Sequence, residues 1–235
     1  MREPAQRREW ARPIAGLAVG FAVVMAALLL AHAYAMLAGL KLRVNDYGTY
    51  VNFLWNSAHG RPFRCFVDQS YLRTHLSFTL LLLAPLFRLW DDPFLLMVVQ
   101  WACPVLGAVI VGRTAARLSL PAPLPAVCAA LFFAYPYTQS VLTCDFHGVA
   151  LYLLLLPWLY HHLTLRRPLV WLPWLLILGL REDAAFVMLP LLLYVAWTRR
   201  WRGGYVFAGL AVAYAAAAIL WLYPRFNEMS LAAQI

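Results

Sequence analysis

Long apolar segments separated by short polar ones run through most of the chain. Within each segment the apolar positions are continuous and do not alternate with polar positions, which favours membrane helices over the strands of a barrel. The apolar segments lie at residues 13–40, 76–90, 94–112, 126–143, 151–163, 170–180, 184–197 and 205–223. Because a helix of about 20 apolar residues can cross a bilayer, several of these segments predict membrane spans.

One segment, residues 45–60, has a different pattern. Its apolar side chains recur at the spacing of one helix face, and its polar side chains lie on the opposite face. The apolar positions are Tyr47, Tyr50, Val51, Leu54, Trp55 and Ala58, and the polar positions are Asn52, Asn56 and His59. This pattern predicts an amphipathic helix that lies flat in the membrane interface, with Asp46 at its N-terminal end, inside an external segment at residues 41–75. A short linker helix without chemistry is the alternative.

Composition supports a membrane protein. Hydrophobic residues make up 64% of the 235 residues and charged residues 12%, and the mean hydropathy is +0.70. These values lie outside the usual range of soluble domains. We therefore expect an all-α fold, a polytopic integral membrane helical bundle. We expect it to be a single transmembrane domain over residues 1–235, with 13–40 as the first transmembrane helix and 76–223 as the remaining membrane helices.

The net charge of +9 by itself would suit nucleic-acid binding. However, the basic residues are scattered between apolar segments, and no soluble basic domain holds them. We interpret them as topology and lipid-headgroup charges, so membrane lipid is an expected partner and nucleic acid is not. The N-terminal arginines precede an apolar segment too long for a signal peptide, which predicts a retained first helix.

The positive-inside rule suggests how the segments cross the membrane. In the arrangement that fits best, residues 76–90 do not complete a crossing, and residues 170–180 and 184–197 form a hairpin that enters from the cytoplasm. The N-terminus and most arginine clusters then lie inside, while the acidic and histidine side chains face outside. This predicts a multi-pass protein of the inner, cytoplasmic membrane with a cytoplasmic N-terminus. The basic residues within 41–75 are an exception, because they would be external.

Three adjacent charges, Arg181, Glu182 and Asp183, lie between two apolar segments. A charged side chain near the bilayer centre costs about 2.5 to 3.5 kcal/mol on insertion scales, so these three must pair or face water. They predict a polar cavity. A set of internal ion pairs that holds helices together is the alternative.

Three further polar side chains lie at the ends of apolar segments. Asp145 and His147 flank Phe146, and a carboxylate with an imidazole suits a divalent metal or an oriented general base. Helix capping by Asp145 is the alternative. His75 opens its segment and is either functional or an interfacial histidine.

The four cysteines show no metal-type spacing. Cys65 and Cys144 lie in connections, and they would form a disulfide if both faced an oxidising compartment.

Four motifs resemble one family of bacterial membrane proteins. The motifs are Asp46 ahead of LWNSAHGRP, then THLSF with His75, then CDFH and then REDA. Their order resembles domain of unknown function 2079, whose members carry D-x6-L-W-N-T-x-x-G-x-P, H-F-S-P, D-F-H-P-E and K-E-D-A. The match runs from about residue 46 to residue 197. The chain departs from the family at Leu76 and Phe78, has Gly148 and Val149 in place of Pro-Glu, and has Arg181 in place of Lys.

That family in turn resembles the GT-C class of membrane glycosyltransferases, which use lipid-phosphate-linked sugars. The resemblance implies a GT-C-like fold, of which this chain is the N-terminal module, and a divalent metal ion, Mg or Mn. It also implies roles for individual residues in one outer cavity. The expected catalytic residues are Asp46, Asp145, Glu182 and Asp183. The residues expected to bind substrate are Arg181, His75, Asn52 and Trp55. The expected metal ligands are Asp46, Asp145 and His147.

The expected function is transfer of a sugar from a polyprenyl-phosphate donor to an extracytoplasmic acceptor. One alternative is an ion- or proton-coupled transporter with a relay at residues 181–183, although the internal repeats typical of transporters are not visible in the sequence. Another is a non-catalytic membrane scaffold. A fragment or degenerate copy of a glycosyltransferase would keep the donor cavity and lack activity.

Overall fold

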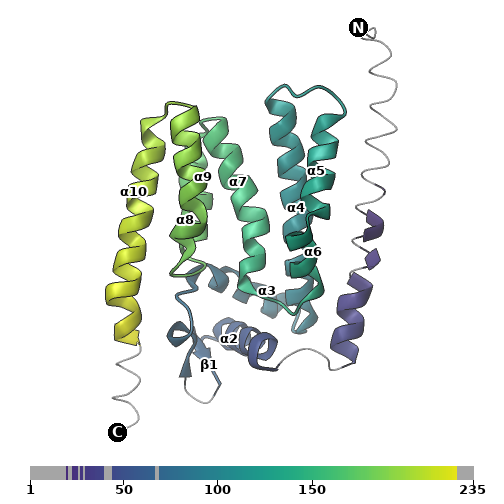
Figure 1. The fold of residues 1–235 in the computed structure, drawn as a ribbon. Coiled ribbons are helices and arrows are strands. Elements are labelled where there is room, and N and C mark those ends of the chain that lie inside the picture. The colour runs from purple at the N-terminus through teal and green to yellow at the C-terminus, as the bar shows by residue number, and fades with distance from the viewer. Residues whose placement is uncertain are drawn as a thin grey trace. The chain divides into compact units, whose positions relative to one another are not determined.

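The structure is a computed structural model that describes residues 20, 23–25, 27–28, 30–39, 44–66 and 69–226 (Figure 1). Helix is present at residues 30–38, within the predicted first span. The N-terminal arginines, residues 13–19 and residues 40–43 lie outside the described residues, as do the predictions made for them.

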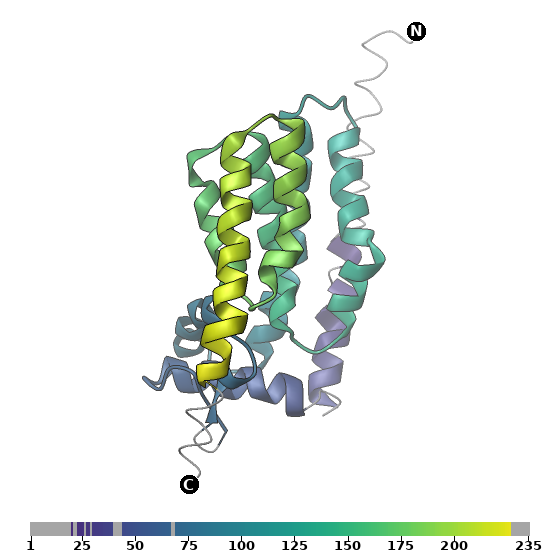
Figure 2. The same ribbon diagram turned by 60° about the vertical axis from the view of Figure 1, so that its left-hand side comes forward.

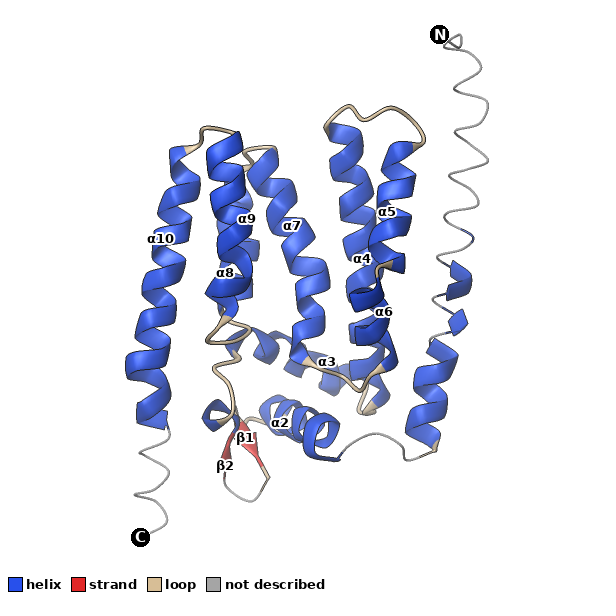
Figure 3. Cartoon of the chain, viewed as in Figure 1, coloured by secondary structure: helices blue, strands red, loops and turns tan. Residues whose placement is uncertain are grey.

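The described chain is helical, which confirms the predicted all-α class (Figure 3). A single short ribbon, β1 paired antiparallel with β2, interrupts the helices in this part of the chain. In order, the elements are η1 (Val44–Gly48), α2 (Thr49–Ala58), β1 (Arg64–Cys65), β2 (Gln69–Ser70), η2 (Tyr71–Arg73), η3 (Phe78–Leu83), α3 (Ala84–Leu89), α4 (Phe94–Arg117), α5 (Leu124–Ala134), α6 (Pro136–Thr143), η4 (Gly148–Leu151), α7 (Tyr152–Thr164), η5 (Pro168–Val170), α8 (Trp171–Leu178), α9 (Ala184–Thr198), α10 (Arg202–Ala217) and η6 (Ala218–Leu222).

Two helices among the described residues are long and apolar enough to cross a membrane. They are Phe94–Arg117, with 24 residues, and Arg202–Phe226, with 25 residues, which contains α10 and η6. The helix at Phe78–Leu89 is shorter than these two. That residues 76–90 do not complete a crossing stays a prediction.

The chain divides into two compact units. The first unit contains the residues up to 43 and Leu96–His161. Its helices α4 and α7 approach closely at Gly107, where a Cβ atom would lie 2.0 Å from the Leu153 carbonyl oxygen. Its core includes Trp101, Phe133 and Leu142.

The predicted crossing at residues 126–143 is broken into α5 and α6. Tyr135, at the break, has φ −59° and ψ 132°, an extended conformation. Proline disfavours a helical conformation in the residue before it, so Pro136 accounts for the break.

The second unit contains Val44–Leu95 and the chain from His162 onward. In it α9 and α10 lie side by side (Figure 2). A Cβ atom on Gly204 would lie 2.8 Å from the Ala196 Cβ atom, so glycine is what permits this close packing. Helix α2 packs on α3 and the ribbon, and the Phe53 ring stacks on Tyr71 at 4.3 Å.

The amphipathic segment forms a helix as predicted, but its buried face differs from the prediction. Asn56 is buried and Trp55 is exposed. The Asn56 amide is satisfied locally, because its Nδ2 donates to the Asn52 carbonyl oxygen at 2.9 Å and to Asn52 Oδ1 at 3.1 Å. Phe53, which the pattern did not place on the apolar face, is completely buried.

Candidate functional site

Residues 75–79 dock on the turn between α8 and α9. Ser77 Oγ donates a hydrogen bond to the Leu180 carbonyl oxygen at 2.7 Å. The Thr79 N–H donates to the Gly179 carbonyl oxygen at 2.8 Å, and Thr79 Oγ1 donates to the Leu176 carbonyl oxygen at 2.8 Å. Two segments about a hundred residues apart in sequence therefore form one polar junction, with Ser77 and Thr79 buried in it.

Gly179 makes this junction possible. A Cβ atom at this position would lie 2.4 Å from Thr79 Oγ1 and 3.3 Å from the Thr79 backbone nitrogen. Any larger residue would displace Thr79 from its hydrogen bonds.

Glu182 links the junction to His75. His75 Nδ1 lies 3.0 Å from Glu182 Oε1, and the Leu76 N–H donates to Glu182 Oε2 at 3.1 Å. Since a carboxylate only accepts, Nδ1 carries the hydrogen and Nε2 is the ring nitrogen that remains for proton exchange. We call His75, Arg181, Glu182 and Asp183 the His75–Glu182 site.

The pKa of Glu182 reflects these contacts. Burial opposes ionisation, but hydrogen bonds from His75 and from the backbone amides of Glu182 and Leu76 outweigh it and lower the pKa of Glu182 to about 2. A carboxyl group with this pKa is ionised near neutral pH. This favours a role in orienting His75 over the proton exchange expected of a catalytic residue.

Arg181 and Asp183 form a two-pronged ion pair. Arg181 Nε donates to Asp183 Oδ1 at 3.0 Å, and Nη2 donates to Oδ2 at 3.2 Å. The Arg181 side chain is 32% exposed, so part of the guanidinium faces solvent while Asp183 fixes its orientation. Asp183 therefore contacts Arg181 and Glu182 contacts His75, and the catalytic roles expected of the two acids stay a prediction.

Tyr214 of α10 is a member of this region that the sequence analysis missed. Its hydroxyl is buried and has no hydrogen-bond partner among the described residues, and it lies near enough to Glu182 to interact with its charge. It packs against Leu72, Leu76 and Ala218. A buried hydroxyl without a partner costs free energy, so it is suited to a water or polar ligand. The feature of the sequence that could have indicated it is a single hydroxyl group within a stretch of mostly small apolar residues, 211–218.

Asp46 lies in η1 and is half-buried. Among the described residues its carboxylate makes no hydrogen bond or ion pair, in contrast to Glu182 and Asp183. The helix that follows Asp46 is joined to the segment carrying His75 through the stack of Phe53 on Tyr71. Asp46 therefore belongs to the same unit as the His75–Glu182 site.

The two predicted substrate contacts on α2 have local roles. Asn52 Oδ1 accepts from the Phe66 N–H at 2.8 Å as well as from Asn56, which ties the ribbon to the helix. Trp55 stacks on His59 with ring centroids 4.1 Å apart.

Asp145 and His147 belong to the first unit, where Gln100 organises their loop. Gln100 Oε1 accepts from the His147 N–H at 3.0 Å, and its Nε2 donates to the Val141 and Cys144 carbonyl oxygens at 2.8 and 3.0 Å. His147 Nδ1 lies 2.8 Å from the Asp145 carbonyl oxygen. Asp145 and His147 line a hollow of about 210 Å³, together with Ser140, Val141, Cys144 and Val149. That Asp145 and His147 lie in one cavity with Asp46 and Arg181 stays a prediction.

Within the described part of the chain, no group of three or more His, Cys, Asp or Glu side chains is arranged to hold a metal ion. The proposed metal set of Asp46, Asp145 and His147 thus stays an implication of the resemblance. All four cysteines are free thiols, including Cys65 and Cys144.

Comparison with known proteins places the chain in a family. No curated protein and no solved structure is detectably similar to it. One family model, described as a predicted membrane protein and named for domain of unknown function 2079, matches residues 37–234, which is most of the chain. The chain therefore belongs to the family of membrane proteins defined by domain of unknown function 2079.

Proposed function

We propose that this protein is a multi-pass protein of the bacterial inner membrane with a GT-C-like fold. In this proposal it transfers a sugar from a polyprenyl-phosphate donor to an acceptor outside the cytoplasm. The His75–Glu182 site and Asp46 face outside.

The observation that supports this proposal is the fixed, partly exposed guanidinium of Arg181. Asp183 holds it at 3.0 Å and 3.2 Å, so little side-chain entropy is lost when it binds an anion. A planar guanidinium fork matches phosphate geometry, and a positive charge here stabilises the phosphate that leaves in the transfer. Arg181 thus binds the donor phosphate.

The transfer needs a proton acceptor. The acceptor hydroxyl oxygen forms a bond to the anomeric carbon, the bond from that carbon to the phosphate oxygen breaks, and the hydroxyl proton passes to a base. Asp46 takes this proton, because its carboxylate is half-buried and uncommitted among the described residues. His75, oriented through Nδ1 by Glu182, offers Nε2 as a second proton acceptor.

Asp145, His147 and a divalent metal keep the roles that the resemblance implies, and no step above depends on them. A non-catalytic scaffold is the second candidate function. It is favoured by the pairing of Glu182 with His75 and of Asp183 with Arg181, since paired charges also hold helices together.

Binding of a long-chain polyprenyl phosphate without a sugar tests the proposal. The purified protein in detergent is titrated with this lipid, and complexes are counted by native mass spectrometry. Arg181→Gln is expected to weaken binding about ten- to a hundredfold, the range for loss of a charged hydrogen-bonded contact. Arg181→Lys retains part of the affinity, because charge remains and the fork is lost.

Arg113→Gln is the matched control, since it removes one exposed arginine from α4 in the other unit, outside both proposed sites. The melting temperature of each variant reports whether folding is intact. Equal affinity of the wild type and a folded Arg181→Gln variant would remove Arg181 from donor binding and favour the scaffold.

A further inference from the structure

The second unit has a strongly basic end. Four arginines lie on its two neighbouring connections, between α7 and α8 and between α9 and α10, and a fifth is the first residue of α10. They are Arg166, Arg167, Arg199, Arg200 and Arg202. Figures 1 and 2 both show these connections at the end of the unit away from α2 and α3. The connections are tied together by Arg166 Nη2, which donates to the Arg199 carbonyl oxygen at 2.8 Å.

No acidic side chain offsets this charge nearby on the same helices. In residues 162–226 the acidic residues are Glu182 and Asp183. They lie before α9, whose 15 residues separate them from Arg199 by about 22 Å at 1.5 Å per residue. Such a separation exceeds the screening length at physiological ionic strength, about 8 Å. The basic end therefore attracts an anion from outside the protein.

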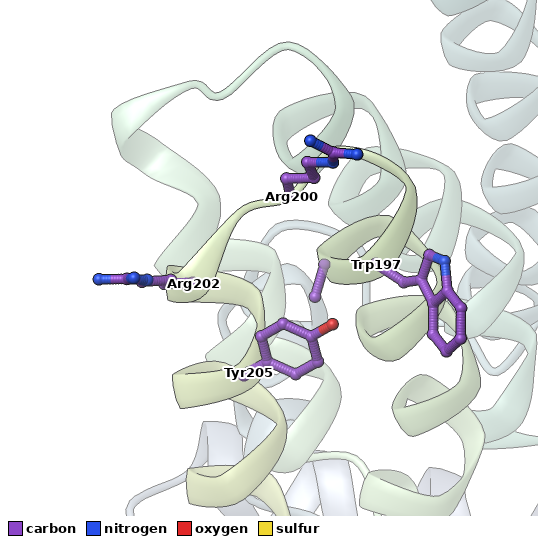
Figure 4. A pocket seen from close by; sticks show the side chains of 5 residues that line it. Trp197, Arg200, Arg202 and Tyr205 are labelled. Atoms are coloured by element: carbon purple, nitrogen blue, oxygen red, sulfur yellow. The ribbon is translucent and has the colours of Figure 1, made fainter.

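A hollow of about 350 Å³ lies at this end, lined by Ala196, Trp197, Arg200, Arg202 and Tyr205. Figure 4 shows the Tyr205 ring from α10 beneath Arg200, with Arg202 extending outward on one side and Trp197 on the other. Arg200 has φ 47°, the left-handed conformation that glycine prefers, and Arg166 has φ 51° in the other connection. Both connections thus have an arginine where a helix commonly ends in glycine.

The surface beside the hollow is apolar. Trp197 is 78% exposed, and α10 and η6 continue from Tyr205 with a row of exposed apolar side chains. Aromatic rings at the start of an exposed apolar helix are typical of the level of lipid headgroups. A ligand that binds both the arginines of the hollow and the exposed apolar face of α10 has an anionic headgroup and apolar chains.

We propose that this hollow binds the headgroup of an anionic phospholipid, with the phosphate at Arg200 and Arg202 and the acyl chains along the exposed face of α10. The phosphate group accepts from the guanidinium groups, and the Tyr205 and Trp197 rings pack at the level of the glycerol. This site is separate from the donor site at Arg181, and it does not depend on the proposed sugar transfer.

Native mass spectrometry of the purified protein with phosphatidylglycerol and with phosphatidylcholine of the same acyl chains tests this site. The wild type is expected to prefer phosphatidylglycerol, with a preference that falls as salt is raised. In Arg200→Gln/Arg202→Gln the affinity for phosphatidylglycerol falls about 25-fold, at about fivefold for each arginine. Trp197→Ala lowers the affinity for both lipids, because its ring contacts the part that they share.

Arg61→Gln/Arg225→Gln is the control, because it removes the same net charge from exposed positions elsewhere in the unit and is expected to keep the preference. Soluble glycerol phosphate is the competitor that separates a lipid from a free anion. The proposal is overturned if the wild type binds the two lipids equally. It is also overturned if both double variants lose affinity to the same extent, or if glycerol phosphate displaces the lipid at equal concentration.

Discussion

Replacement of Glu182 by glutamine tests the polar junction most sharply. The side chain keeps its shape but loses its charge, and one of its two oxygens becomes an N–H donor that faces either His75 Nδ1 or the Leu76 N–H. Those donors lie 3.0 Å and 3.1 Å from the carboxylate. Either one hydrogen bond is lost, or His75 takes the other tautomer so that Nδ1 accepts from the glutamine N–H, and in both cases the contacts lose the strength that the carboxylate charge gives them.

The lowered pKa of Glu182 gives the size of the effect. A shift from 4.5 to about 2 corresponds to about 3 kcal/mol at about 1.4 kcal/mol per unit. The side chain is 17% exposed, so solvent screening reduces this value, and we expect Glu182→Gln to lower the free energy of unfolding by about 1 to 3 kcal/mol.

The same shift determines the pH dependence. Because the folded-state pKa is lowered, the contribution of Glu182 to stability is fully present above the unfolded value of 4.5 and is lost as the pH falls through about 2. The difference in unfolding free energy between the wild type and Glu182→Gln should therefore shrink by more than half between pH 7 and about pH 3.

Unfolding in mixed micelles, followed by tryptophan fluorescence at both pH values, measures this difference. Asp183→Asn is the matched control: its side chain is 46% exposed, and loss of such a pair costs at most about 1 kcal/mol. The reasoning is refuted if Glu182→Gln is as stable as Asp183→Asn, or if its deficit is the same at pH 7 and pH 3.

Three further predictions concern other parts of the second unit. Gly179→Ala should lower the melting temperature, because its Cβ would meet Thr79, while Gly209→Ala, with open space around it, should not; thermal unfolding compares them. Asp46→Asn should abolish sugar transfer without lowering the melting temperature, and transfer that persists in a radiolabelled-donor assay would remove Asp46 from the mechanism. Asn52→Ala should expose the ribbon to protease, because the Phe66 N–H loses its acceptor; an unchanged cleavage rate would contradict this.

The sequence was sufficient for features that depend on local pattern. The helix after residue 44 follows from the 3.6-residue period of its apolar side chains, and Pro136 marks the break between α5 and α6. The burial of Asn56 was not predictable in the same way. Its amide is satisfied by Asn52, whose own oxygen is positioned by a loop residue, Phe66.

In the candidate site, too, the local features were predictable from the sequence and the long-range contacts were not. The charges at residues 181–183 predicted a polar region, but the sequence does not say which charges pair. Glu182 contacts His75, 107 positions away, and that choice depends on the docking of Thr79 against Gly179. Tyr214 was missed because one hydroxyl in an apolar helix resembles an interfacial tyrosine until its burial beside Glu182 is known.

The accessibility of the two ends of the second unit tests the central claim most directly. Thr74→Cys places a thiol at an exposed position beside His75, and Arg200→Cys places one at the basic end, each in a Cys144→Ser background. Intact cells are treated with a membrane-impermeant maleimide before and after permeabilisation. We predict labelling of Thr74→Cys in intact cells and of Arg200→Cys after permeabilisation alone. Labelling of Thr74→Cys after permeabilisation alone would contradict a site that faces outside.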